Sequence, residues 1–137
     1  VLVGEIRDLE TAENATQASL TGHLVFSTLH TNDTTSSYSR LLDMGIDPFL
    51  ITSTVRAIIA QRLIRKICTS CRKERAVNEF EQEKYGFSSG EKVFESNNDG
   101  CQNCAGNGFR GRCGIYELLI PTHSINEMIN NRKLTCC

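Results

Sequence analysis

The stretch from residue 1 to residue 30, VLVGEIRDLETAENATQASLTGHLVFSTLH, decides the fold. It opens with a short apolar run over residues 1–4, followed by a helix-compatible segment over 8–20 and a Thr-Gly helix stop. A second apolar, β-rich run covers residues 23–30. Strand, helix and strand within about 30 residues predict a βαβ unit, with parallel strands and a right-handed crossover.

Polar side chains stand where these two expected strands end. Glu5 follows the first strand, and Thr28 and His30 end the second. Ligands of open parallel sheets bind outside the carboxyl ends of the strands. A carboxylate and an imidazole at that edge suit the activation of water beside a phosphate or a metal. Alternatively, Glu5 is a helix-start acid and His30 a neighbour of a helix cap, and the residues alone leave both interpretations open.

Further along the chain, helix and strand signals continue to alternate. Asp47, followed by a proline, predicts a helix start, and the apolar stripe behind it predicts that this helix runs over 47–67. A short helix is expected near 78–85, a strand over 116–120, and a last helix capped by Ser124.

The seven cysteines are the compositional outlier. Four of them form two Cys-x-x-Cys pairs, Cys68 with Cys71 and Cys101 with Cys104. Such a turn presents two thiolates on one side of a loop, and two such turns complete a four-thiolate zinc site. The longer gap between the pairs leaves room for a small insert. The alternatives are a disulfide framework or redox chemistry.

The remaining cysteines have no Cys-x-x-Cys partner. Cys113 is expected to be a small buried residue, and Cys136 and Cys137 receive no function.

Length and charge limit the possible roles. The 137 residues fit one domain, or a part-domain with an appendage. The net charge of −1 provides no overall attraction to nucleic acid or anionic membranes. No apolar run reaches the 18 or so residues of a membrane span, and no signal peptide is present. A core-type strand at the very start, without Met, suggests a chain cut from something longer. One basic stretch, RLIRKICTSCRKER, keeps a zinc-stabilised nucleic-acid module as an alternative.

Several motifs together carry a family resemblance. GEIRD, STLHTN, AQRL, the paired Cys-x-x-Cys motifs and RGRCGIYE occur in this order. In this the chain resembles the secretion ATPases, the hexameric P-loop motors of type II secretion and type IV pilus assembly. The resemblance implies an α/β fold: the C-terminal half of a RecA-like P-loop NTPase core, with an inserted tetracysteine zinc module and a small C-terminal α/β tail. The expected divisions are 1–67, 68–104 and 105–137.

The same resemblance implies roles for individual residues. Glu5 matches the Walker B glutamate, a catalytic base or magnesium-linked carboxylate, and His30 matches the histidine that contacts the nucleotide site. Supporting positions and zinc ligands follow from the matching motifs. The supporting residues are Gly4, Arg7, His23 and Thr28, and the zinc ligands are Cys68, Cys71, Cys101 and Cys104. The implied cofactors are ATP with Mg²⁺, and Zn²⁺.

The implied function is ATP hydrolysis that powers type II protein secretion or type IV pilus assembly. The implied partners are further copies of the chain in a homo-hexamer and inner-membrane platform proteins, with no nucleic acid. The implied location is cytoplasmic, peripheral at the inner face of the bacterial inner membrane. No Gly-x-x-x-x-Gly-Lys-[Ser/Thr] loop occurs in the sequence, so we expect this chain to be inactive alone. The helix expected over 47–67 would transmit motion to the zinc module. The alternative is a zinc-stabilised docking or nucleic-acid-binding module without ATPase activity.

Overall fold

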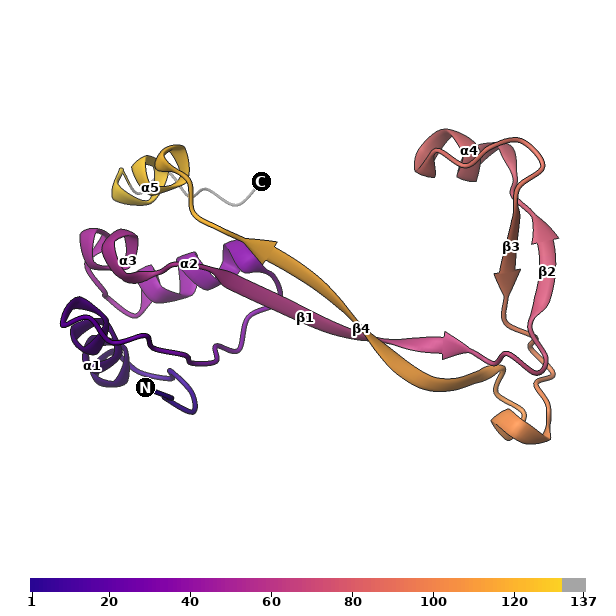
Figure 1. The fold of residues 1–137 in the computed structure, drawn as a ribbon, viewed down its shortest axis with the longest axis horizontal. Coiled ribbons are helices and arrows are strands. Elements are labelled where there is room, and N and C mark those ends of the chain that lie inside the picture. Colours follow the sequence, from indigo (N-terminus) through magenta and orange to yellow (C-terminus); the bar gives the residue numbers. More distant parts are fainter. Residues whose placement is uncertain (132–137) are drawn as a thin grey trace. The chain divides into compact units, whose positions relative to one another are not determined.

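The computed structural model describes residues 1–131, which form two compact units (Figure 1). The first, here the helical unit, comprises Val1–Gln61 and the chain from Tyr116 onward. The second, here the cysteine unit, comprises Arg62–Ile115. Cys136 and Cys137 lie outside the described residues.

Four helices build the helical unit, and aspartates begin three of them. The helices are α1 (Leu9–Leu20), α2 (Thr34–Asp43), α3 (Pro48–Thr54) and α5 (His123–Asn130). The Asp8 carboxylate accepts from the Thr11 N–H at 2.8 Å at the start of α1, and Asp33 and Asp47 act in the same way at α2 and α3. Each cap satisfies a backbone donor that has no partner inside its helix. The prediction that Asp47 begins a helix, with proline at its first position, is confirmed.

The core of this unit lies between the four helices. Its members are apolar side chains that are almost fully buried, namely Ala12, Tyr38, Leu41, Ile46, Ile51 and Ile129. They come from α1, α2, α3, α5 and the turn after α2. Because Ile129 comes from α5, the last described helix closes the core that the first helices begin.

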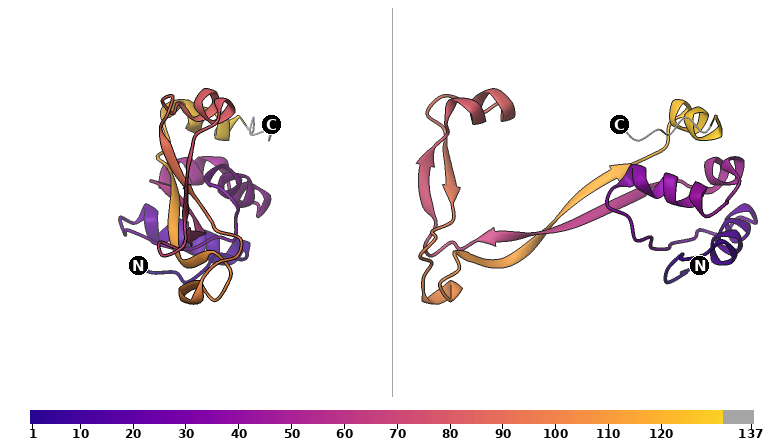
Figure 2. Two further views of the ribbon diagram at one scale, coloured as in Figure 1. Left: turned by 90° about the vertical axis from the view of Figure 1, so that its right-hand side faces the viewer. Right: turned by 180° about the vertical axis from the view of Figure 1, so that it is seen from behind.

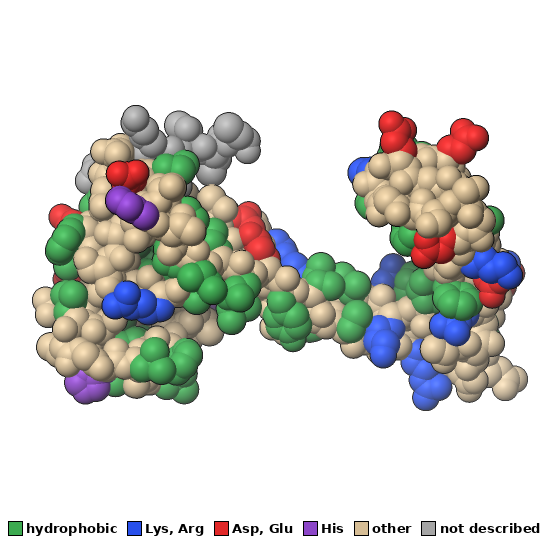
Figure 3. Space-filling model, turned by 45° about the horizontal axis from the view of Figure 1, so that its top comes forward, with side chains coloured by type: hydrophobic (Ala, Val, Ile, Leu, Met, Phe, Trp, Pro, Cys, Tyr) green, Lys and Arg blue, Asp and Glu red, His purple; other side chains and the backbone are tan. Residues whose placement is uncertain are grey.

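The two apolar runs at the start of the chain meet as a parallel bridge, which confirms the parallel arrangement. Leu2 pairs with Phe26, the Val3 N–H donates to the Phe26 carbonyl at 2.9 Å, and the Ile6 N–H donates to the Thr28 carbonyl at 3.0 Å. The full-length strands that we expected are reduced to this bridge. Leu2 and Phe26 remain 82% and 61% exposed, whereas parallel strands are normally covered on both faces. Figure 3 shows hydrophobic side chains on the surface.

The cysteine unit contains a hairpin with a helix in its connection. Strand β2 (Lys73–Ala76) pairs antiparallel with β3 (Lys92–Glu95), and α4 (Glu79–Tyr85) lies between them in sequence, as Figure 2 shows. Asn78 and Glu81 form a capping box at the start of α4, which confirms the short helix expected there. Arg75 donates to both Glu81 carboxylate oxygens, at 2.7 and 2.6 Å, and so ties the helix to β2.

The helix predicted over 47–67 is wrong in its second half. Helix α3 ends at Thr54, Val55 is extended, and residues 58–67 form strand β1 (Ile58–Ile67). Strand β1 pairs with β4 (Phe109–Leu119), and the two arrows run in opposite directions in Figure 1. The physical reason is the distant partner: an apolar stripe allows either form, and pairing with a segment some tens of residues away in the chain favours the strand.

Three smaller expectations also change. The strand predicted over 116–120 is the end of the longer β4. The last helix is capped by Thr122 instead of Ser124, because the Thr122 hydroxyl accepts from the Ile125 N–H. Cys113, expected to be buried, is exposed on β4.

Candidate functional site

The Glu5 carboxylate is the centre of a small ionic cluster at the end of the parallel bridge. Its Oε2 accepts from the Arg7 Nε at 2.6 Å, and its Oε1 lies 2.6 Å from the His30 Nε2. The Glu5 side chain is only 20% exposed, whereas the Arg7 and His30 side chains are 74% and 85% exposed. The structure therefore brings together three of the predicted site residues around one largely covered carboxylate.

Two further predicted residues hold the ends of the two runs together. The Thr28 hydroxyl donates to the Gly4 carbonyl oxygen at 2.8 Å, across 24 positions of sequence. Next to it, the Ile6 N–H donates to the Thr28 carbonyl. In this structure, Thr28 and Gly4 thus form the platform from which Glu5 and His30 project, and their supporting role at a nucleotide site stays a prediction.

His23 does not join this cluster. It stands at the start of the second run, just after α1, with its Nδ1 3.2 Å from both the Ala18 carbonyl and the Thr21 hydroxyl. In a parallel pair, the start of one strand and the end of its neighbour lie at opposite edges, so His23 is remote from Glu5 along the strand direction. Its contribution to a nucleotide site stays a prediction.

A cavity of about 390 Å³ adjoins the ionic cluster. It is lined by Glu5, Ile6, Arg7, His30 and Arg40. Two lining residues were not predicted from the sequence: Ile6, and the charged Arg40, which projects from α2. Arg40 comes ten positions after His30, on the helix that follows the histidine loop, and this spacing is the one signal for it in the sequence. Only the packing of α2 shows that the Arg40 side chain reaches the cavity. Two arginines beside a carboxylate and an imidazole suit a site for an anionic substrate that undergoes hydrolysis.

One carboxylate oxygen of this cluster lacks a hydrogen bond. The Glu5 Oε1 is buried and has no aligned hydrogen bond, because the close approach of His30 is an ionic contact without hydrogen-bond geometry. A buried carboxylate oxygen without a hydrogen bond is costly unless it receives a donor or a cation. A magnesium-bound water or an attacking water would supply that donor, so the residues present fit an ATP site that uses Mg²⁺.

The four predicted cysteine ligands come together in the cysteine unit. Their sulfur atoms all lie within 4.8 Å of one another. The Cys68–Cys101, Cys71–Cys104 and Cys101–Cys104 sulfur distances are 3.9, 3.8 and 3.8 Å. Separations of this size are far too long for disulfide bonds, which join sulfurs about 2 Å apart. The arrangement favours a metal ion at the centre over a disulfide framework.

Backbone groups prepare these sulfurs for a metal. Burial by itself raises the pKa of the Cys104 thiol, but the Cys101 and Gly108 N–H groups, at 3.1 and 3.3 Å from its sulfur, lower that pKa to about 6. A hydrogen bond from the Ser70 backbone lowers the pKa of Cys68, whereas burial raises the pKa of Cys71 to about 12. Without a cation, adjacent thiolates repel one another, so deprotonation is uneven. A bound cation would stabilise the deprotonated form of all four cysteines, so each of them would be a thiolate.

Gly108 makes the second cysteine turn possible. Its φ is +72°, and a Cβ there would lie 2.4 Å from the Asn97 carbonyl oxygen. Its carbonyl accepts from the Cys68 N–H at 2.9 Å, and its N–H donates to Cys104. One glycine thus bonds to a cysteine from each Cys-x-x-Cys turn, in a backbone conformation that a side chain would oppose.

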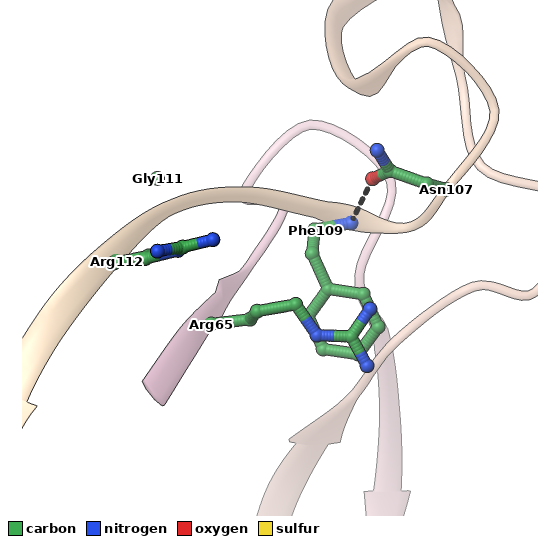
Figure 4. Close-up of a pocket in the computed structure, with 5 residues that line it drawn as sticks. All are labelled: Arg65, Asn107, Phe109, Gly111 and Arg112. Atoms are coloured by element: carbon green, nitrogen blue, oxygen red, sulfur yellow. Dashed lines mark hydrogen bonds between the residues drawn. The ribbon is translucent and has the colours of Figure 1, made fainter. Parts of the chain in front are cut away.

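Side chains of the basic stretch over residues 62–75, which begins within β1, make contacts inside the cysteine unit. The Arg65 guanidinium lies 4.0 Å from the centre of the Phe109 ring, and Arg72 lies 3.7 Å from that of Phe94. Figure 4 shows Arg65 against Phe109 beside a cavity of about 190 Å³, which Asn107, Gly111 and Arg112 also line.

Solved structures with a similar fold define the class of protein. The pilus retraction motor PilT with bound ADP superposes with a TM-score of 0.62 at 31% identity, over 97% of this chain and 29% of that chain. The ATPase DotB of Yersinia pseudotuberculosis is similar in fold, with a TM-score of 0.57 over 97% of this chain and 26% of that chain. The fold is therefore the mixed α/β fold of these ATPases, which confirms the predicted fold class.

The family follows from the sequence comparison. The family model described as type II/IV secretion system protein matches residues 1–136, and this chain belongs to that family. Type II secretion system protein E of Dickeya dadantii (strain 3937) is 47% identical over 131 residues, which cover 96% of this chain and 26% of the relative. The type IV pilus assembly ATPase PilB of Myxococcus xanthus (strain DK1622) is 46% identical over 141 residues, covering 96% and 24%. The chain thus spans about a quarter of the length of these relatives.

Within residues 1–131, none of the helices has both the length and the apolar character that a bilayer crossing requires.

Proposed function

We propose that the protein containing this chain is an ATPase that powers type II protein secretion or type IV pilus assembly. The observation that carries the proposal is the Glu5–Arg7–His30 cluster beside its cavity, in a chain whose relatives include a protein named as a pilus assembly ATPase. The phosphate-binding loop would come from residues outside this sequence, and the chain alone would be inactive.

The catalytic roles follow from charge and burial. Glu5 accepts a proton from, or orients, the water that attacks the terminal phosphate. Arg7 and His30 hold its two oxygens in place, and the exposed His30 ring is free to turn toward a phosphate. Arg40, across the cavity, supplies a positive charge to the transferred phosphoryl group. A bound Mg²⁺ would neutralise phosphate charge in this site.

The test is the substitution Glu5→Gln in the intact protein. Loss of the carboxylate should lower kcat for ATP hydrolysis by about 100-fold or more, as expected for removal of a general base, while ATP binding persists. Glu10→Gln is the matched control, because Glu10 is an exposed glutamate in the first turn of α1. Unchanged hydrolysis in Glu5→Gln would overturn the catalytic assignment.

We propose that the ion held by the cysteine cluster is zinc in a structural site. A tetrahedron with Zn–S arms of about 2.3 Å has sulfur–sulfur edges of about 3.8 Å, close to the 3.8–3.9 Å of three of the six separations in this cluster, all of which are within 4.8 Å. Four protein ligands leave no open position for a substrate, which supports a structural role. The division into a nucleotide-site segment over 1–67, a zinc module over 68–104 and a tail over 105–137 is part of the same proposal.

The assembly and location are proposed from the family. The intact protein would act as a homo-hexamer on the inner face of the bacterial inner membrane, through contacts with platform proteins and without nucleic acid. Size measurement of the intact protein, with and without a non-hydrolysed ATP analogue, tests the oligomer. A monomer under both conditions would contradict it.

A further inference from the structure

His30 lies in the loop over residues 30–33. Its side chain is 85% exposed, so its placement over Glu5 depends on the backbone on both sides: Thr28, bonded to Gly4 and Ile6, on one side and residues 31–33 on the other. The loop leads directly into α2. A contact that holds the first turn of α2 therefore also contributes to the position of the imidazole beside the carboxylate.

Inside the loop, short polar contacts connect the backbone to α2. The Thr31 hydroxyl lies 2.7 Å from the Ser37 hydroxyl, and Ser37 is only 2% exposed. The Ser37 hydroxyl also donates to the Asp33 carbonyl at 3.2 Å. These contacts join the loop to the first turn of α2, and the side chains of Tyr38 and Leu41 pack that helix into the core of the helical unit.

Strand β4 adds a polar contact at the start of α2. The Glu117 carboxylate accepts from the Thr34 hydroxyl through Oε1 and from the Thr34 N–H through Oε2, at 3.4 Å for the latter. The two residues are 83 positions apart, and Thr34 is fully buried. A hydroxyl in such a position needs a partner, and the carboxylate is the one it has.

Electrostatics make this contact suited to a helix start. The cap residue Asp33 accepts from the Ser36 N–H at 2.7 Å, which leaves the Thr34 N–H for Glu117. The first turn of α2 contains no acidic residue. The Glu117 carboxylate from β4 thus adds a second negative charge, beside that of the Asp33 cap, at the positive end of the helix.

We propose that Glu117 is a positioning residue for His30: it anchors the start of α2, and thereby holds the histidine loop in register with Glu5. The inference rests on the proposed function, because it assigns a role in the same hydrolysis. Glu117 is not among the residues that line the cavity. Its effect passes through Thr34, Ser37 and Thr31 to the His30 backbone.

The expected kinetic signature differs from that of lost substrate binding. In the intact protein, Glu117→Ala should lower kcat for ATP hydrolysis roughly 10-fold and leave KM for ATP nearly unchanged, since misplacement of a catalytic group mainly affects the transition state. Thr34→Val removes only the buried hydroxyl and should reproduce the kcat effect. Glu127→Ala, at an exposed glutamate of α5, is the matched control and should behave as the unmodified protein.

A double-mutant cycle with His30→Ala separates positioning from a merely structural role. If Glu117 acts through His30, then Glu117→Ala should have almost no further effect on kcat once His30 is alanine. Multiplicative losses in the double variant, or a full kcat in Glu117→Ala, would overturn the inference. Failure of the proposed function shows itself separately, as unchanged hydrolysis in both Glu5→Gln and His30→Ala.

Should Glu117→Ala not fold, Glu117→Gln keeps one acceptor oxygen and the size of the side chain. It should retain the Thr34 hydroxyl contact and lose the charge at the helix start, with a kcat between those of Glu117→Ala and the unmodified protein. The positioning role of Glu117 would also be contradicted if Glu117→Gln had a kcat as low as that of Glu117→Ala and if its loss of kcat multiplied with that of His30→Ala in the double variant.

Discussion

The cysteine cluster and the Glu5 cluster are assembled in different ways. The four cysteines lie in two short turns, each with its spacing written into four consecutive residues, and the metal-sized space between their sulfurs is complete within residues 68–104. Glu5 instead meets His30 at the ends of two apolar runs, and its further neighbour Arg40 arrives from a helix. A site whose residues lie in short turns can be predicted from their spacing in the sequence, whereas a site at the ends of strands depends on how the helices and strands pack.

The two regions also differ in what stabilises them. The cysteine unit has a small buried core in which Cys68 and Cys104 are themselves among the buried residues. The helical unit has a continuous apolar core around Tyr38 and Ile51. We therefore expect the first to depend on its ion and the second on its packing, and the following predictions test that contrast.

The largest effect is expected from Cys104→Ser. Apparent free energies of zinc binding in small structural sites reach about 10–16 kcal/mol, so the loss of one of four ligands should abolish stoichiometric zinc and amide protection in β2 and β3. Zinc content and hydrogen exchange of the intact protein measure both. Cys113→Ser is the control, because Cys113 is exposed on β4. Full zinc content in Cys104→Ser would show that this sulfur is not a ligand.

A change in the helical core should be smaller and should leave the zinc in place. Ile51 is 1% exposed, so Ile51→Ala should destabilise the helical unit by about 2–5 kcal/mol through lost burial and a residual cavity. Hydrogen exchange of the α3 amides in the intact protein measures this loss of stability. Phe49→Ala on the same helix, at a side chain 67% exposed, should cost far less. Loss of zinc in Ile51→Ala would break the contrast between the two units.

Gly108→Ala should weaken the ion site without removing a ligand. The positive φ and the clash with the Asn97 carbonyl together should cost about 1–3 kcal/mol, observed as easier removal of zinc by a chelator. Gly106→Ala separates the two causes, because Gly106 has a φ of +78° but no atom within 4 Å of a Cβ. Equal effects of the two substitutions would assign the cost to backbone conformation alone.

The smallest effect concerns pH. Hydrogen bonds from Arg75, and then the Asn78 N–H, lower the pKa of Glu81 from its ordinary 4.5 to about 2. Because this pKa is depressed in the folded state, the contact stabilises α4 above pH 4.5, and that stabilisation is lost progressively as the pH falls toward 2. Amide exchange in α4 should rise across this window. In Glu81→Gln the rise should be flatter; an identical profile would remove Glu81 as its cause.

The segment over 47–67 shows where pattern reasoning stops. Asp47 and the proline after it determine a helix start by local chemistry, and α3 begins there. Beyond Thr54 the apolar spacing fits a helix and a strand alike. Pairing with β4, a segment distant in the chain, makes these residues a strand, and no signal in the neighbouring sequence reveals that pairing. Consequently, the proposal that one continuous helix transmits motion to the zinc module loses its structural basis.

The candidate site divides in the same way. Glu5 and His30 could be predicted from the sequence because the ends of parallel strands share an edge. Arg40 and Glu117 could not: Arg40 reaches the cavity from α2, Glu117 contacts Thr34 from β4, and nothing in the neighbouring sequence distinguishes either from an ordinary surface charge. His23 lies just after α1, with its Nδ1 3.2 Å from the Ala18 carbonyl oxygen, and its contribution to a nucleotide site stays a prediction.

The sequence by itself determined the cysteine cluster, the helix start at Asp47 and the parallel order of the first two apolar runs, because each depends on residues that are neighbours in the chain or on the chirality of a short connection. Only the tertiary structure decided the β1–β4 pairing, the contact of Glu117 with Thr34 and the closing of the core by Ile129. These depend on contacts between segments separated by tens of residues, whose free energy exists only once the chain has packed.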